Sequence, residues 1–139
     1  MNQPTRGGER LRFEEFEHQT SQNGRARVRV VLVWGEERFT GEATGIETRE
    51  GAGRTAALAA VAAAHAVTRG QLSAELVGIK LVRAFDAWIV ITALRAQSAE
   101  RAYRLLGSSE APGDDTARGA VLSVLDGLNR VLEKYVQRD

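Results

Sequence analysis

The segment at residues 87–94 (AWIVITAL) decides the fold, because it has the length of a strand and is apolar on both sides. Alternate side chains of a strand point to opposite faces. One face of this strand therefore carries Trp88, Val90, Thr92 and Leu94, and the other carries Ala87, Ile89, Ile91 and Ala93. Leaving either face in water would forgo about 1.5–3 kcal/mol for each large side chain. The helices of one chain can blanket one face of a sheet, so we expect a second copy to cover the other.

This expectation is a homo-oligomer that forms through the sheet face, with Trp88, Val90, Ile89 and Ile91 in the contact. Two arrangements within one chain stay open: the sheet curls on itself, or the N-terminal segment folds over it. The charge of the chain favours no other partner, because 19 Lys and Arg residues against 18 Asp and Glu residues leave a net charge of +1.

The rest of the second half extends this pattern. The predicted order is strand, turn, strand, strand, loop and helix, at residues 76–84, 85–86, 87–94, 101–106, 108–114 and 115–135. The turn is Phe85-Asp86, and the last helix shows an apolar stripe of period 3.6. Asp114 and Asp115 precede it, where an acidic side chain caps a helix and complements its dipole.

The first half shows the same order. Residues 11–18 predict an edge strand with a bulge or a single amphipathic turn, of which we favour the strand. A turn, two strands and a helix follow at residues 21–24, 25–34, 38–46 and 55–68. The strand at residues 25–34 (RARVRVVLVW) alternates most clearly. Gly51-Ala52-Gly53 leads into the helix, which is rich in alanine, the best helix former.

The two halves therefore read as copies of one unit, with Gly41 in the place of Gly107. We predict an α+β fold of tandem duplicated βββα units, with a six-stranded antiparallel sheet covered on one face by two helices. Residues 1–10 are predicted as a disordered N-terminal tail. Residues 11–137 form a single domain, with unit one at residues 11–69 and unit two at residues 72–137.

The residue types exclude most catalytic chemistry. The chain has no cysteine and only two histidines, His18 and His65, so paired histidine ligands and a Ser-His-Asp set both lack material. We expect no enzyme, no catalytic residue, no metal and no cofactor. The polar start and the lack of a long apolar run predict a cytoplasmic protein with no membrane segment.

Three arginines, Arg25, Arg27 and Arg29, share one strand face, and helix, three strands and helix is also the order of a double-stranded RNA binding domain. Such a domain needs a lysine cluster at the start of its last helix, where this chain has Gly113-Asp114-Asp115. Acids there repel phosphates, so we do not expect nucleic acid as a partner. The arginines are better explained as a solvated face or one paired with glutamates.

Together these elements resemble the C-terminal regulatory domain of the α-isopropylmalate synthase and citramalate synthase family. The resemblance rests on GAGRTAAL at residues 51–58, on FDA at residues 85–87, and on GDDT at residues 113–116 with LNR at residues 128–130. It covers approximately residues 11–136 and implies tandem βββα units that dimerise through their sheets. It also implies binding of leucine or isoleucine as a feedback inhibitor, without the family's catalytic barrel.

We therefore expect a non-enzymatic oligomeric regulatory module that binds a small amino-acid-like ligand near the helix starts. The expected ligand residues are Gly51, Gly53, Arg54, Thr55, Asp86, Asp114, Asp115 and Thr116. Main-chain N–H groups of residues 51–55 would receive the carboxylate, and Asp114, Asp115 or Asp86 the ammonium group. Because the same residues suit turns and caps, a structural self-assembly module without ligand is the alternative, and an RNA-binding protein stands third.

Overall fold

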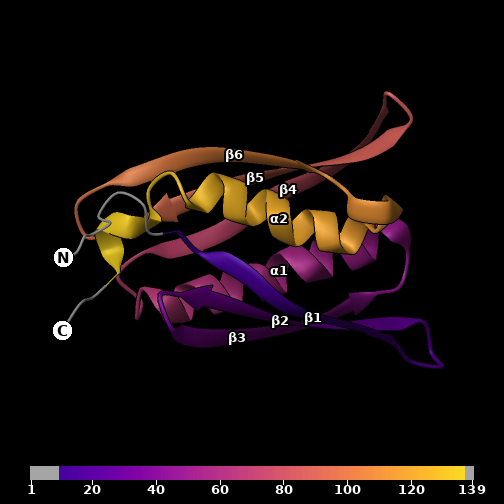
Figure 1. Cartoon of the computed structure of the whole chain (residues 1–139), viewed down its shortest axis with the longest axis horizontal. Helices are drawn as coiled ribbons and strands as arrows, with labels where there is room; N and C mark the ends of the chain where they lie inside the picture. The colour runs from indigo at the N-terminus through magenta and orange to yellow at the C-terminus, as the bar shows by residue number, and fades with distance from the viewer. Residues whose placement is uncertain (1–9, 137–139) are drawn as a thin grey trace.

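The computed structural model describes residues 10–136, which form two three-stranded sheets with two helices between them (Figure 1). In chain order the elements are β1 (Arg12–Thr20), β2 (Arg25–Trp34), β3 (Glu37–Ile46), α1 (Arg49–Val67), β4 (Ser73–Ala84), β5 (Ala87–Gln97), β6 (Ala102–Glu110), η2 (Pro112–Asp114), α2 (Thr116–Leu128) and η3 (Leu132–Tyr135). Apart from Arg10, the tail predicted at residues 1–10 lies outside the described residues, as does residue 137 at the end of unit two.

The α+β class and the repeated βββα order are confirmed, but the prediction of one six-stranded sheet was wrong. The strands form two antiparallel sheets, in the orders β1-β2-β3 and β4-β5-β6. Helix α1 packs on β2 and β3, helix α2 packs on β5 and β6, and the helices pack on each other. Each sheet therefore buries one face on a shared helix layer, and the two sheets lie on opposite sides of it.

Each unit has a glycine where its third strand crosses its helix. A Cβ atom on Gly41 of β3 would lie 2.5 Å from the Ala63 nitrogen of α1. A Cβ atom on Gly107 of β6 would lie 2.8 Å from the Gly127 nitrogen of α2. Backbone atoms cannot move aside like a side chain, so both positions need glycine, and the equivalence of Gly41 and Gly107 holds in three dimensions.

Both units also carry a bulge in the first strand. The register of β1 shifts between Phe13 and Glu15, which confirms the bulge predicted for this segment. The register of β4 shifts between Leu76 and Gly78. The two bulges occupy equivalent positions. In unit one Gly41 pairs with Val30, and the bulge begins opposite Leu32, two residues further along β2. In unit two Gly107 pairs with Thr92, and the bulge begins opposite Leu94, two residues further along β5.

Three predicted boundaries were wrong by four residues or more, and strands β4 and β5 are each three residues longer than predicted. Helix α1 begins at Arg49 and not at residue 55, because Thr48 caps it and the alanine-rich continuation tolerates two early glycines. Strand β6 continues to Glu110 through the segment predicted as a loop, because its residues pair with β5. Helix α2 stops at Leu128, although the apolar stripe continues through the buried Leu132 in η3.

Candidate functional site

The start of α1 does not present free amide groups from its glycines. The Thr48 hydroxyl oxygen accepts a hydrogen bond from the Gly51 N–H at 2.9 Å, so Gly51 and Gly53 lie in the first turns of the helix. Thr55 is buried, and its hydroxyl donates to the Gly51 carbonyl oxygen at 2.8 Å. Arg54 is exposed. A carboxylate receptor at this helix start would therefore rely on Arg54 more than on the amide of Gly51.

The start of α2 uses one of its acids as a cap. Asp115 accepts a hydrogen bond from the Arg118 N–H at 3.1 Å and forms an ion pair of 3.8 Å with the Arg118 Nε. Asp114 is exposed and has a φ of 64°. Thr116 is only 5% exposed, and its hydroxyl forms no hydrogen bond with another described residue.

The structure brings the two helix starts together. A Cβ atom on Gly53 of α1 would lie 3.9 Å from the Thr116 carbonyl oxygen of α2. The two helices run in the same direction, so their positive dipole ends lie at the same end of the molecule (Figure 1). Asp86 lies in the turn between β4 and β5, a hairpin that projects from the same end of the molecule as the two helix starts (Figure 1). The sequence-predicted residues are thus split between the paired helix starts and one hairpin tip.

Arginine–aromatic contacts beside the helix starts were not predicted from the sequence. The Arg49 and Arg83 guanidinium carbons lie 4.9 Å and 5.4 Å from the ring centroid of Trp88. The Arg118 carbon lies 5.4 Å and 5.0 Å from the Phe13 and Phe16 rings. Arg49 on α1 thus reaches the β4–β6 sheet, while Arg118 on α2 reaches the β1–β3 sheet. The partners are far apart in sequence, and no motif signals the contacts.

The outer face of β1–β3, which we term the charged face, is covered by ion pairs. Its charged residues are Glu14, Glu15, Glu17, Arg27, Arg29, Arg38 and Glu42. Arg29 lies within 4.0 Å of carboxylates from Glu15, Glu17 and Glu42, and Arg27 lies 3.1 Å from Glu42. Of the three arginines on this strand, Arg27 and Arg29 thus pair with glutamates, whereas Arg25 is exposed and forms no ion pair with another described residue. Val31, also on this face, is only 1% exposed, whereas Ile46, at the end of β3, is 61% exposed.

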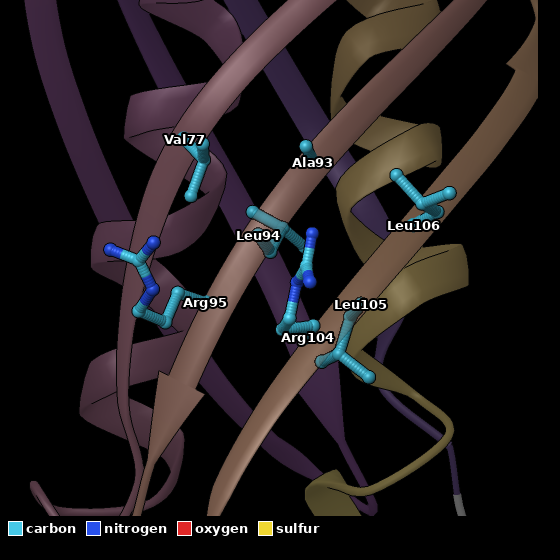
Figure 2. A pocket seen from close by; sticks show the side chains of 7 residues that line it. All are labelled: Val77, Ala93, Leu94, Arg95, Arg104, Leu105 and Leu106. Atoms are coloured by element: carbon cyan, nitrogen blue, oxygen red, sulfur yellow. The ribbon is translucent and has the colours of Figure 1, made fainter.

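The outer face of β4–β6, which we term the apolar face, has a different composition. Its apolar side chains are Val77, Val82, Ile89, Ile91, Ala93 and Leu106. Val77 is 50% exposed and Leu106 is 63% exposed. The face holds one ion pair among the described residues, between Glu75 and Arg95 at 3.5 Å. A groove of about 350 Å³ runs between Val77 and Leu106 (Figure 2).

Strand β5 therefore presents only half of its apolar side chains to this face. Val90 is fully buried on the helix layer, and Trp88 lies on the same inner face between two arginines. Ile89 and Ile91 point outward, where they are partly buried by neighbouring strands. Of the four contact residues predicted for a homo-oligomer, Ile89 and Ile91 face outward, whereas Trp88 and Val90 face the helix layer and are not placed to meet a second copy.

A second groove, of about 480 Å³, lies where the edge strands β1 and β6 border α2. The end of α2 supplies polar partners for both edges. Asp126 accepts a hydrogen bond from the Ser108 N–H at 3.0 Å, and Arg130 donates to the Leu106 carbonyl oxygen at 2.5 Å. Asn129 binds both the N–H and the carbonyl oxygen of Leu11, at 2.8 Å and 3.1 Å. These side chains form hydrogen bonds with backbone groups that could otherwise pair with an additional strand at the sheet edge.

The remaining titratable groups suggest no catalytic set. His18 lies 2.8 Å from Glu47, and His65 is exposed on α1. The Tyr103 and Tyr135 hydroxyls are 2.5 Å apart. A hydrogen bond from Ser98 lowers the pKa of Tyr135, and the hydrogen bond to Tyr135 raises the pKa of Tyr103.

Within residues 10–136 there is no cluster of three or more metal-ligating side chains. In the same part of the chain, neither helix has the length and hydropathy needed to cross a membrane.

Comparison with known proteins adds no further assignment. A scan of the sequence against models of protein families finds no match, and a search of curated proteins finds none either. The resemblance to the α-isopropylmalate synthase regulatory domain therefore stays a prediction based on the short stretches described above.

Proposed function

We propose that this chain is a non-enzymatic regulatory module that works as a homo-oligomer. The observation that carries the proposal is the contrast between its two outer faces. The ion pairs of the charged face cover Val31, and its exposed Ile46 lies at the end of β3, whereas the apolar face leaves both Val77 and Leu106 at least half exposed beside one groove. A contiguous apolar patch with a polar rim is typical of a surface that meets a partner.

The proposed partner is a second copy of the chain. Besides its apolar side chains this face carries Glu75, Lys80, Arg95, Arg104 and Glu110, so both signs of charge are present and a second copy can offer opposite charges to them. The resemblance to a family whose regulatory domains dimerise through their sheets supports the same choice. The pairing of Arg27 and Arg29 with glutamates argues against a phosphate-binding role for the charged face.

The proposed ligand is a small amino acid bound beside the paired helix starts. Arg54 offers a cation for the carboxylate, and the exposed Asp114 offers an anion for the ammonium group. Two helix dipoles with their positive ends together favour the carboxylate further. The rival, a structural assembly module without ligand, is favoured by the capping roles of Thr48 and Asp115.

Light scattering after size exclusion tests the oligomer. We expect the wild-type chain to be a dimer and Ile91→Lys to be a monomer with an unchanged circular dichroism spectrum, because a lysine at the centre of the contact would bury a charge. Thr44→Lys adds the same charge on the exposed charged face and is the matched control, for which we expect a dimer. A wild-type monomer at micromolar to millimolar concentration would refute the proposal.

Calorimetry with leucine, isoleucine and valine tests the ligand. We expect heat from at least one of them, and at least a tenfold weaker affinity in Asp114→Asn, because the ammonium group loses its counter-charge. Asp126→Asn, at the far end of α2, is the control and should bind as the wild type does. A dimer that gives no heat with any of the three amino acids would leave only the structural assembly role.

A further inference from the structure

The tip of the β4–β5 hairpin carries an aromatic residue that no part of its own chain covers. Phe85 is 100% exposed, and the hairpin projects beyond the rest of the molecule (Figure 1). Phe85 and Asp86 have φ values of 52° and 60°, in the left-handed region that phenylalanine rarely adopts. The equivalent turn between β2 and β3 places Gly35 in this region instead, at a φ of 64°. An exposed aromatic side chain held on a disfavoured backbone is typical of a contact site.

The opposite end of the same sheet carries the complementary chemistry. Arg95 and Arg104 face each other directly on β5 and β6, an arrangement of like charges that is unfavourable without an anion nearby. Arg95 already pairs with Glu75, but the Arg104 guanidinium forms no ion pair with another described residue. Figure 2 shows Arg104 beside the groove between Val77 and Leu106. This end therefore combines an unfilled apolar groove with an unneutralised positive charge.

A carboxylate that could neutralise this charge lies at the tip of the β4–β5 hairpin. The carboxylate of Asp86, next to Phe85, forms no hydrogen bond or ion pair with another described residue. One copy cannot join its own tip to its own groove, because the eight residues from Phe85 to Ala93 span roughly 27 Å of strand. A second copy, related to the first by a two-fold axis that runs across the strands, places its hairpin tip over the groove of the first copy.

We propose that two copies exchange hairpin tips across the apolar face, with Phe85 of each copy in the groove of the other and Asp86 against the Arg95–Arg104 pair. The axis that achieves this passes between Ile89 and Ile91, which lie halfway along β5 between the tip and the groove. Ile89 and Ile91 then lie at the centre of the contact, beside their strand partners Glu110 and Lys80, and further charged contacts lie at both ends. The inference rests on the proposed homo-oligomer and specifies its geometry.

A charge swap tests the proposal, with dimer dissociation constants from sedimentation velocity. Asp86→Arg and Arg104→Glu each place like charges together at both ends of the dimer, so we expect each to weaken it at least tenfold. The double variant Asp86→Arg with Arg104→Glu restores the attraction with its sign reversed and should bind within threefold of the wild type. Phe85→Ala should also weaken the dimer about tenfold. Glu36→Arg, in the turn between β2 and β3, is the matched control and should have no effect.

The outcomes separate this inference from the proposed function. All these positions are exposed, so circular dichroism should show an intact fold in every variant. A dimer that Ile91→Lys disrupts, but that Asp86→Arg, Arg104→Glu and Phe85→Ala leave unchanged, would overturn the exchange of tips and retain association through the face. Weakening by both single charge variants without rescue in the double variant would show that Asp86 and Arg104 do not meet. A wild-type monomer would overturn both proposals.

Discussion

The two βββα units have nearly the same inner architecture and opposite outer surfaces. Each has a bulge in its first strand and a glycine where its third strand crosses its helix. Yet Arg29 of β2, in the place of Ile91 of β5, belongs to a network of ion pairs, while Ile91 belongs to an apolar patch. The close approach of strand and helix backbones therefore fixes the inner face of each sheet, whereas the outer face is free to take on a function.

The inner faces also show that one close contact can be made in two ways. In unit one Gly45 of β3 faces Thr55 of α1, and a Cβ atom on Gly45 would collide with the Thr55 hydroxyl. In unit two the equivalent residues are Ala111, just after β6, and Gly119 of α2. The glycine has changed sides, from the strand to the helix. Each crossing therefore accommodates one side chain and not two.

The largest expected effect comes from the shared glycine crossings. Gly41→Ala and Gly107→Ala should each lower the free energy of unfolding by more than about 3 kcal/mol, because the new Cβ atoms meet the backbone of α1 or α2. Urea denaturation measures the loss. Gly78→Ala in an Ile91→Lys background, where the proposed dimer contact is lost, is the control, since no atom lies within 4 Å of its Cβ position, and it should change stability by less than about 0.5 kcal/mol. Equal, small effects at all three glycines would mean that the crossings do not fix the sheets.

The next effect tests the exchanged glycine. Gly119→Ala would normally stabilise a helix, but its Cβ lies 3.0 Å from the Ala111 Cα and 3.0 Å from Val90 Cγ2. We expect a loss of about 1.5 kcal/mol instead. Ala111→Gly in the same chain should recover part of this loss, with a coupling energy of about 1 kcal/mol in a double-mutant cycle. Additive effects of the two substitutions would contradict the reciprocal arrangement.

The sequence predicted what periodicity and propensity control. The alternation at residues 25–34 and 87–94, the turn at residues 85–86 and the correspondence of Gly41 with Gly107 all identify real features. These patterns are local, or they repeat along the chain. The start of α1 was missed because Gly51 and Gly53 read as a loop, although the cap at Thr48 reverses that reading.

The sequence could not predict how the two units meet. Nothing in the period of a strand states whether β3 pairs with β4 or lies across a helix layer from it. The buried hydrogen bond between Thr92 and Ser123, at 2.6 Å, joins residues that only the packing of α2 on β5 brings together. The meeting of the two helix starts, where Gly53 of α1 lies near Thr116 of α2, follows from the same packing and has no sequence signal.

Two substitutions would make the charged face more apolar. Arg29→Leu together with Glu42→Leu removes the central ion pairs over Val31. Since exposed pairs are worth roughly 0.2–1 kcal/mol each, we expect stability to change by no more than about 1 kcal/mol. We also expect assemblies larger than a dimer, because both outer faces would then associate. Light scattering at increasing concentration measures this, and a variant that remains a dimer would show that an apolar sheet face is not sufficient for association.

The smallest effect concerns the hairpin turns and separates stability from association. Phe85→Gly makes the β4–β5 turn resemble the β2–β3 turn with Gly35, and it removes the cost of a left-handed phenylalanine. That cost is about 1–2 kcal/mol, and the greater freedom of glycine in the unfolded chain offsets most of it, so we expect a gain of about 0.5 kcal/mol. Urea denaturation in an Ile91→Lys background measures this gain without a contribution from dimerisation. In the otherwise wild-type chain, the same substitution should weaken the dimer. A substitution that stabilises the fold and weakens the assembly would mean that Phe85 is retained for the contact between copies, whereas a loss of stability in the monomer would mean that it packs within its own chain.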